Sequence, residues 1–299
     1  MSRENKTKLT STEIAYVWDA YMRENMIYCF NRYFLENVDD YEIEHILEQA
    51  FTLSQKKMFD LSQILNEADV PVPQGFGDED VDRNAPRLYS DSFLLYNTAY
   101  FSKAQINAYS KSFSECTRSD IRHFFEKCIV SATSVYNKSV NVLLSKGLYI
   151  RPNYIVAAVE TNSERTKMTN RELFGRNRRL TTMELANINA NLQSNAFARG
   201  LITGFAQVAQ SKNVRYYLSK GREIANKHMK ILTKVLQDEE ILAPSGWDME
   251  STDSVIPPFS DKLMMFSVSV ICAAGYANYA DSAASTMRED VQNYYTRFM

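Results

Sequence analysis

Residues 70–90 read VPVPQGFGDEDVDRNAPRLYS and contain three prolines and two glycines. Proline removes a backbone donor and glycine weakens a helix, so this composition excludes helix over most of the segment. About 20 extended residues can span ~60 Å or more, which is enough to run the length of a helical bundle. The segment therefore predicts a long crossover between the helices on either side of it. A surface loop in an up-down-up-down bundle is the alternative.

Helical periodicity surrounds this segment. Apolar residues recur at helical spacing, and helices are predicted over residues 11–34, from about 39 onward, over 91–114 and over 118–145. Thr10 and Glu13 form a capping pattern before the first helix, and Gly147 suits the end of the fourth. Short links within each pair predict two antiparallel hairpins. Two hairpins joined by a long crossover make a ferritin-like four-helix bundle.

The chain contains this pattern twice. Leu9-Thr-Ser-Thr-Glu13 resembles Leu180-Thr-Thr-Met-Glu184 at an offset of 171 residues. The same offset pairs Phe34 with Phe205, Met58 with Met229 and Gly75 with Gly246, and an offset of 170 then pairs Asp91 with Asp261 and Tyr109 with Tyr279. An offset kept through helices, caps and a loop indicates an internal duplication. The fold class is therefore all-α, with one bundle over 9–148, a linker over 149–179 and a second bundle over 180–299.

The fourth helix of the second bundle is expected to be incomplete. Its counterpart starts near Arg288 and the sequence stops at Met299, so the second half of the helix has no counterpart. A truncated product is one explanation. The other is an open apolar groove filled by a partner helix or a second subunit, because exposed apolar surface is unfavourable. We expect a homo-oligomer that associates through this incomplete bundle.

Composition limits the class of protein. The 299 residues are 45% hydrophobic and 23% charged with a net charge of −2, which excludes global disorder and a global basic field for nucleic acid. Residues 1–8 carry no apolar signal segment, and the apolar stretch 263–274 is too short to span a bilayer. The four cysteines are scattered without a C-x-x-C pair, namely Cys29, Cys116, Cys128 and Cys272. We expect a cytoplasmic protein with reduced thiols.

Several motifs carry a family resemblance. The L-T-x-x-E helix start and the P-x-G-[FW] crossover occur in both repeats, G-L-Y-I-R-P (147–152) closes the first, and G-F-x-Q-V-A (204–209) lies in the second. The sequence resembles an uncharacterised family of tandem ferritin-like proteins from spore-forming Firmicutes, distantly similar to spore coat proteins of the coat F type. The resemblance implies the fold and a possible spore setting. It implies no catalytic residues.

A di-metal centre is the activity that a ferritin-like bundle suggests first. Such a centre needs carboxylates on all four helices, and the third helix of neither repeat has one between its ends. Weak candidates for metal ligands are Glu42, His45, Asp120, His123, Glu223 and His228. The first four lie in the first turns of two antiparallel helices, and Glu223 and His228 point to different faces. We therefore predict no metal site and no cofactor, and a surface or capping role for His45 and His123.

Aromatic residues crowd the first and third helices. An aromatic cavity for an apolar ligand is one interpretation, with candidate residues Trp18, Tyr21, Tyr28, Tyr96 and Tyr100. Packing of the core is the other interpretation, because aromatic stripes at helical spacing are usually core.

The sequence thus favours a non-enzymatic structural or interaction protein of a sporulating bacterium, cytoplasmic or spore-associated. The alternatives are a module that binds an apolar ligand in the first bundle and a di-metal oxidase or oxygenase.

Overall fold

The computed structural model describes residues 7–152, 178–243 and 251–299. Over these residues the regular elements are α-helices, one short 3-10 helix at Asp78–Asp80 and two isolated β-bridges. The predicted all-α class is confirmed. The chain divides into two compact units. The first comprises Met1–Tyr149 with Val208–Gln210 and Glu250–Met265, and the second comprises Ile150–Gln207, Ser211–Met249 and Phe266–Met299.

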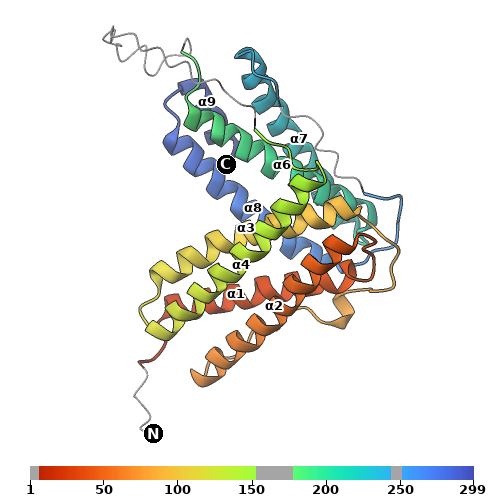
Figure 1. Cartoon of the computed structure of the whole chain (residues 1–299), viewed down its shortest axis with the longest axis vertical. Helices are drawn as coiled ribbons and strands as arrows, with labels where there is room; N and C mark the ends of the chain where they lie inside the picture. The colour runs from red at the N-terminus through yellow and green to blue at the C-terminus, as the bar shows by residue number, and fades with distance from the viewer. Residues whose placement is uncertain (1–6, 153–177, 244–250) are drawn as a thin grey trace. The chain divides into compact units, whose positions relative to one another are not determined.

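Four long helices build the first unit, and Figure 1 shows them side by side: α1 (Ser11–Phe34), α2 (Tyr41–Glu67), α3 (Asp91–Glu115) and α4 (Ser119–Ser145). Thr10 caps α1 and forms a capping box with Glu13, as predicted. Asp40 caps α2 by accepting from the amides of Glu42 and Ile43. Gly147 follows α4 with a φ of 67°, a conformation that glycine adopts without strain.

The segment after α2 is a crossover, as predicted. It starts at the C-terminal end of α2 and delivers Asp91, the first residue of α3, to the opposite end of that helix. There the Asp91 carboxylate accepts from the backbone amide of Asp40 at 2.9 Å. The path therefore runs along the whole of α2, which is ~40 Å for 27 residues.

Buried polar groups hold the crossover against α1. The Asn25 side-chain amide accepts from the Phe76 amide and donates to the Phe76 carbonyl at 3.3 Å. Further along, the Tyr33 hydroxyl donates to the Pro86 carbonyl at 2.7 Å and accepts from the Leu88 amide at 2.8 Å. These bonds satisfy backbone groups that the buried loop could not otherwise pair.

Segment 250–265 belongs to the first unit although the second repeat supplies it. Phe259 packs among the core aromatics, with its ring centroid 4.7 Å from that of Phe30 and 5.2 Å from that of Tyr33. The Ser260 amide donates to the Asp80 carbonyl at 3.0 Å. The offset that defines the repeat gave no sign of this contact.

The second repeat contains α6 (Thr182–Val208), α7 (Lys212–Asp238), α8 (Asp261–Ser285) and α9 (Glu289–Phe298), which lie in the second unit except for Val208 of α6 and the start of α8 up to Met265. The helix α9 has 10 residues up to Phe298, next to the last residue of the sequence, where α4 has 27. Most of the predicted linker 149–179 lies outside the described residues. The helix α8 is long and apolar enough to cross a membrane, a criterion that the buried core helices of soluble proteins also meet. The apolar region is longer than the predicted stretch 263–274.

Candidate functional site

A buried ionic cluster lies midway along the helices of the first bundle. Lys57 of α2 donates from Nζ to Glu24 Oε1 of α1 at 3.2 Å. From α3, Gln105 donates from Nε2 to the same oxygen at 2.5 Å, and the Tyr109 hydroxyl donates to it as well. Three donors from two other helices thus converge on one carboxylate oxygen.

Burial makes this cluster energetically critical. Glu24 is 0% exposed and Lys57 is 7% exposed. A buried carboxylate without a counter-ion costs several kcal/mol, so the ammonium and the carboxylate depend on each other. The Lys57 ammonium also lies over the Tyr109 ring, 5.1 Å from its centroid. Burial, and next the negative charge of Glu24, raises the pKa of Tyr109, which keeps the phenol protonated as a donor.

A small cavity of about 20 Å³ adjoins the cluster. Residues from all four helices line it, among them Lys57, Asn97, Gln105 and Ala132. Within the described part of the chain, Asn97 Oδ1 and Glu24 Oε2 are buried without a hydrogen-bond partner. A cavity of this size holds about one water molecule, whereas organic ligands occupy ~300 Å³ or more. By its size the cavity therefore suits a water molecule rather than an organic ligand.

The second bundle has a neutral version of this cluster at equivalent positions. Asn195, His228 and Tyr279 correspond to Glu24, Lys57 and Tyr109 by the repeat offsets. The Asn195 Nδ2 donates to the Tyr279 hydroxyl at 2.7 Å, and that oxygen lies 2.9 Å from His228 Nδ1. Burial, and next the charge of Lys227, lowers the pKa of His228 to about 4, so its imidazole is neutral at physiological pH. The ring stacks on Phe298, with centroids 3.9 Å apart.

The chemistry of these residues does not fit a di-metal centre. In the first bundle the Lys57 ammonium stands beside the one buried carboxylate at this level and would repel a metal cation. In the second bundle an amide, a neutral imidazole and a phenol supply no carboxylate to bridge two metals. No group of three or more His, Cys, Asp or Glu suited to a metal ion occurs among residues 7–152, 178–243 and 251–299.

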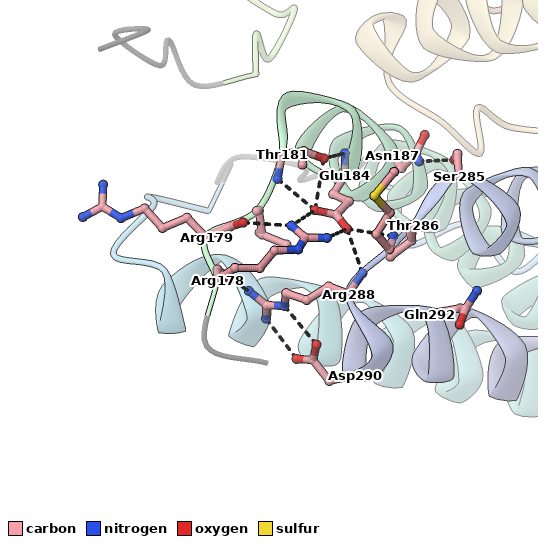
Figure 2. A network of polar contacts seen from close by, with 12 residues as sticks. Arg178, Arg179, Thr181, Glu184, Asn187, Ser285, Thr286, Arg288, Asp290 and Gln292 are labelled. Atoms are coloured by element: carbon pink, nitrogen blue, oxygen red, sulfur yellow. Dashed lines mark hydrogen bonds and ion pairs between the residues drawn. The ribbon is translucent and has the colours of Figure 1, made fainter. Parts of the chain in front are cut away.

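A second repeated feature is a clasp at one end of each bundle. In the first, Glu13 Oε1 accepts from the amides of Thr117 and Arg118 at 2.9 and 2.8 Å, which ties the start of α1 to the turn before α4. Figure 2 shows the equivalent clasp in the second, where Glu184 Oε1 accepts from the Arg288 amide at 3.0 Å. Arg178 adds two bonds to the Glu184 carboxylate, at 2.8 and 2.6 Å.

The environment of these clasps keeps both carboxylates ionised. Burial raises the pKa of Glu13, but hydrogen bonds from Thr10, Arg118 and Thr117 outweigh it and hold the pKa at about 2. For Glu184, burial is likewise outweighed by bonds from Arg178, Thr181 and Arg288, and its pKa is also about 2. We interpret the clasps as structural, because the bonds described above join residues of the same unit.

The sequence-predicted metal candidates are not brought together. Each candidate carboxylate has a basic partner: Glu42 pairs with Lys146, Asp120 with Arg118, and Glu223 with Lys220. His45 and His123 are exposed, each beside a glutamate three residues on, at 3.2 and 3.1 Å. His228 is the exception, since it lies buried in the neutral cluster described above.

The five candidate aromatic residues do not line the cavity. Trp18 is 46% exposed, Tyr28 stacks on Phe51, and the Tyr96 hydroxyl donates to the Leu148 carbonyl. Tyr21 and Tyr100 are half-buried. Their role in binding a ligand remains a prediction.

Sequence reasoning missed Glu24, Lys57 and Gln105. One signal could have found two of them: the offset of 171 aligns Glu24 with Asn195 and Lys57 with His228, polar residues within otherwise apolar helix faces. Two repeats that both place a polar side chain at the same interior level indicate a buried network.

Comparison with known proteins places these features in a family. The family model described as "Protein of unknown function (DUF3231)" matches residues 2–158 and 168–299. This match in two tandem segments confirms the predicted resemblance to an uncharacterised tandem family. No curated protein matches the chain significantly. A crystal structure from Bacillus halodurans C-125, of a protein provisionally described as a spore coat protein, matches with 17% identity and a TM-score of 0.46, covering 50% of this chain and 96% of that chain.

Proposed function

The chain belongs to the DUF3231 family of proteins of unknown function, and we propose that it is a non-enzymatic structural or interaction protein. In this proposal its two bundles are ferritin-like in descent and have replaced the metal centre by internal side-chain networks. The family resemblance drawn from its motifs supports a setting in the cytoplasm or the developing spore of a sporulating bacterium.

The observation that carries the proposal is the position of Lys57. Its ammonium group contacts the Glu24 carboxylate at the mid-bundle level where ferritin-like proteins hold metal ions. The ammonium supplies the positive charge that a metal would supply, and Gln105 and Tyr109 use the same oxygen. The three protein donors all use Oε1, so Oε2 is the one oxygen of this carboxylate left without a hydrogen bond in the described part of the chain.

Metal analysis of the full-length protein tests this proposal. After incubation with Fe²⁺, Mn²⁺ or Zn²⁺ and gel filtration, we expect well under one metal ion per chain. Two ions per bundle would overturn the proposal. The Lys57→Ala variant is the matched comparison, because removing the ammonium exposes the carboxylate to external cations. The Glu24→Gln variant removes the carboxylate, so any metal that Lys57→Ala binds through Glu24 should disappear in the Glu24→Gln/Lys57→Ala double variant.

A further inference from the structure

Two short strips of the chain, residues 81–90 and 251–260, pair with each other inside the first unit. They are called the first strip and the second strip below. Two antiparallel β-bridges join them, Val81 with Phe259 and Tyr89 with Ser251. Each strip precedes the third helix of its own repeat, so the pairing joins equivalent parts of the duplication.

The register of this pairing follows the repeat. The offset of 170 residues that relates the third helices also aligns the two strips from end to end. It takes Val81 to Ser251 and Tyr89 to Phe259, so the two bridges exchange places when the repeats are exchanged. Antiparallel strands can pair in many registers, and this is the one in which equivalent residues make equivalent contacts. Such a contact is isologous, the form that two identical subunits make about a two-fold axis.

The backbone hydrogen bonds obey the same relation. The Asp82 amide donates to the Pro258 carbonyl at 2.9 Å. The Thr252 amide donates to the Leu88 carbonyl at 2.8 Å. These two bonds also exchange under the offset of 170 residues, so each strip supplies one donor and one acceptor at equivalent places. The pairing is therefore self-complementary at the level of the backbone.

The first strip carries side chains suited to the places that the second strip fills. Phe259, which packs among the aromatic rings of the first unit, corresponds to Tyr89, another aromatic residue. Ser260 donates from Oγ to Asp80 Oδ1 at 2.5 Å and corresponds to Ser90, which has the same hydroxyl. A first strip from another copy of the chain thus offers the same surface an aromatic ring, a hydroxyl and the same backbone bonds.

We propose that the first strip is a docking site for the first strip of a second copy of this chain, and that the second strip occupies this site within the single chain. Linkage in one polypeptide gives the second strip an effective concentration of about millimolar, so a second copy at micromolar concentration does not displace it. The site opens when the second strip leaves. The inference goes beyond the proposed function, since it does not depend on whether either bundle binds metal.

Two substitutions in the full chain displace the second strip. Thr252→Pro removes the amide that donates to Leu88, and Phe259→Asp places a charge among aromatic rings. Light scattering of this displaced chain should show association to twice the mass of one chain, which is 34.4 kDa.

A disulfide identifies the contact. Two forms of the displaced chain are mixed, one with Val81→Cys and the other with Tyr89→Cys, and both carry Cys272→Ser to remove the exposed native thiol. In the proposed pairing, position 81 of one copy faces position 89 of the other. Bonds on either side make this a non-hydrogen-bonded pair, with Cα atoms about 4.5 Å apart and within reach of a disulfide. Under mild oxidation a linked dimer should form in the mixture and in neither variant alone.

The matched control keeps the second strip in place. Val255→Asp changes a side chain of this strip that is 73% exposed, and it replaces the two displacing substitutions in the control mixture. The yield of linked dimer should be at least about tenfold lower there, because the linked second strip outcompetes another copy. Circular dichroism checks the helices of each variant. If the double substitution unfolds them, Thr252→Pro alone is the milder displacement and should give an intermediate yield.

The proposal is overturned if folded displaced chains give no linked dimer, or if the control mixture gives as much of it. Association without the disulfide would place the contact on another surface and overturn the proposal as well. Metal analysis of the unsubstituted protein decides the proposed function separately, so the two failures are distinguishable.

Discussion

The Lys57 ammonium lies 3.2 Å from the Glu24 carboxylate, between two adjacent helices of the first bundle, and both side chains are buried. Neither charge could be tolerated there alone. The side chains at position 24 of α1 and position 57 of α2 therefore have to match in charge. The equivalent positions of the second bundle hold Asn195 and His228.

Replacing Lys57 by methionine should strongly destabilise the protein. The substitution keeps the volume but leaves Glu24 buried without its counter-ion, so we expect the free energy of unfolding to fall by about 3 kcal/mol or more. Urea denaturation measures it. The Glu24→Gln/Lys57→Met double variant should regain a large part of the loss, because both charges are gone.

The neighbouring Lys56 provides the control, since its side chain is 71% exposed. Lys56→Met should change the free energy of unfolding by no more than about 0.5 kcal/mol. Equal stability of the Lys57→Met and Lys56→Met variants would contradict the role assigned to the buried pair.

Acid should weaken the two clasps. The pKa values of Glu13 and Glu184 in the folded protein are about 2, below the ordinary value of 4.5. The unfolded chain therefore binds these protons first, so the stabilisation is complete above about pH 4.5 and is lost as the pH falls toward 2. Melting temperatures measured from pH 6 to pH 2 should decrease over that window. The Glu13→Gln/Glu184→Gln variant should have a lower melting temperature at pH 6 and a smaller decrease in melting temperature toward pH 2. An unchanged decrease would rule out the clasps as the source of the acid sensitivity.

His228 should contribute a second pH dependence at higher pH. Its pKa is lowered from 6.5 to about 4 by burial, so the folded protein holds it neutral while the unfolded chain binds a proton. Its contribution is complete above pH 6.5 and is lost as the pH falls toward 4. Imidazole proton resonances followed by NMR should show no titration of His228 between pH 7 and pH 5. A midpoint near 6.5 for this residue would contradict its burial beside Tyr279 and Phe298.

The packing of the crossover against α1 should require a glycine at position 75. A Cβ at position 75 would lie 2.3 Å from Asn25 Oδ1, and moving that side chain breaks its bonds to Phe76. Gly75→Ala should therefore lower the free energy of unfolding by ~1–3 kcal/mol, the cost of leaving buried polar groups unpaired. Gly275→Ala is the matched control. Nothing lies within 4 Å of its Cβ, so helix propensity should make this variant up to ~1 kcal/mol more stable. Equal effects of the two substitutions would argue against the tie between Asn25 and the crossover.

The local features of the fold were predictable from particular residues. Thr10 and Glu13 mark the first helix start, and the structure has that capping box. The prolines and glycines of residues 70–90 mark the crossover, which the Asp91–Asp40 contact confirms. Signals of this kind act over a few residues, so they can be read without knowing which helices meet.

The cluster at Glu24 could not be read in this way. Its three donors lie 33 to 85 residues from Glu24 in the chain, and periodicity places Glu24 and Lys57 on apolar helix faces without showing that they meet. Whether a charged side chain is buried depends on which faces the packed helices present to one another.

Sequence alone was enough to establish the helices, their caps, the crossover and the duplication, because propensity, capping and spacing are properties of neighbouring residues. Packing established the ionic cluster, the neutral His228 and the insertion of Phe259 among the aromatics of the first unit. Each of these depends on residues distant in the chain whose burial is favourable only when they meet.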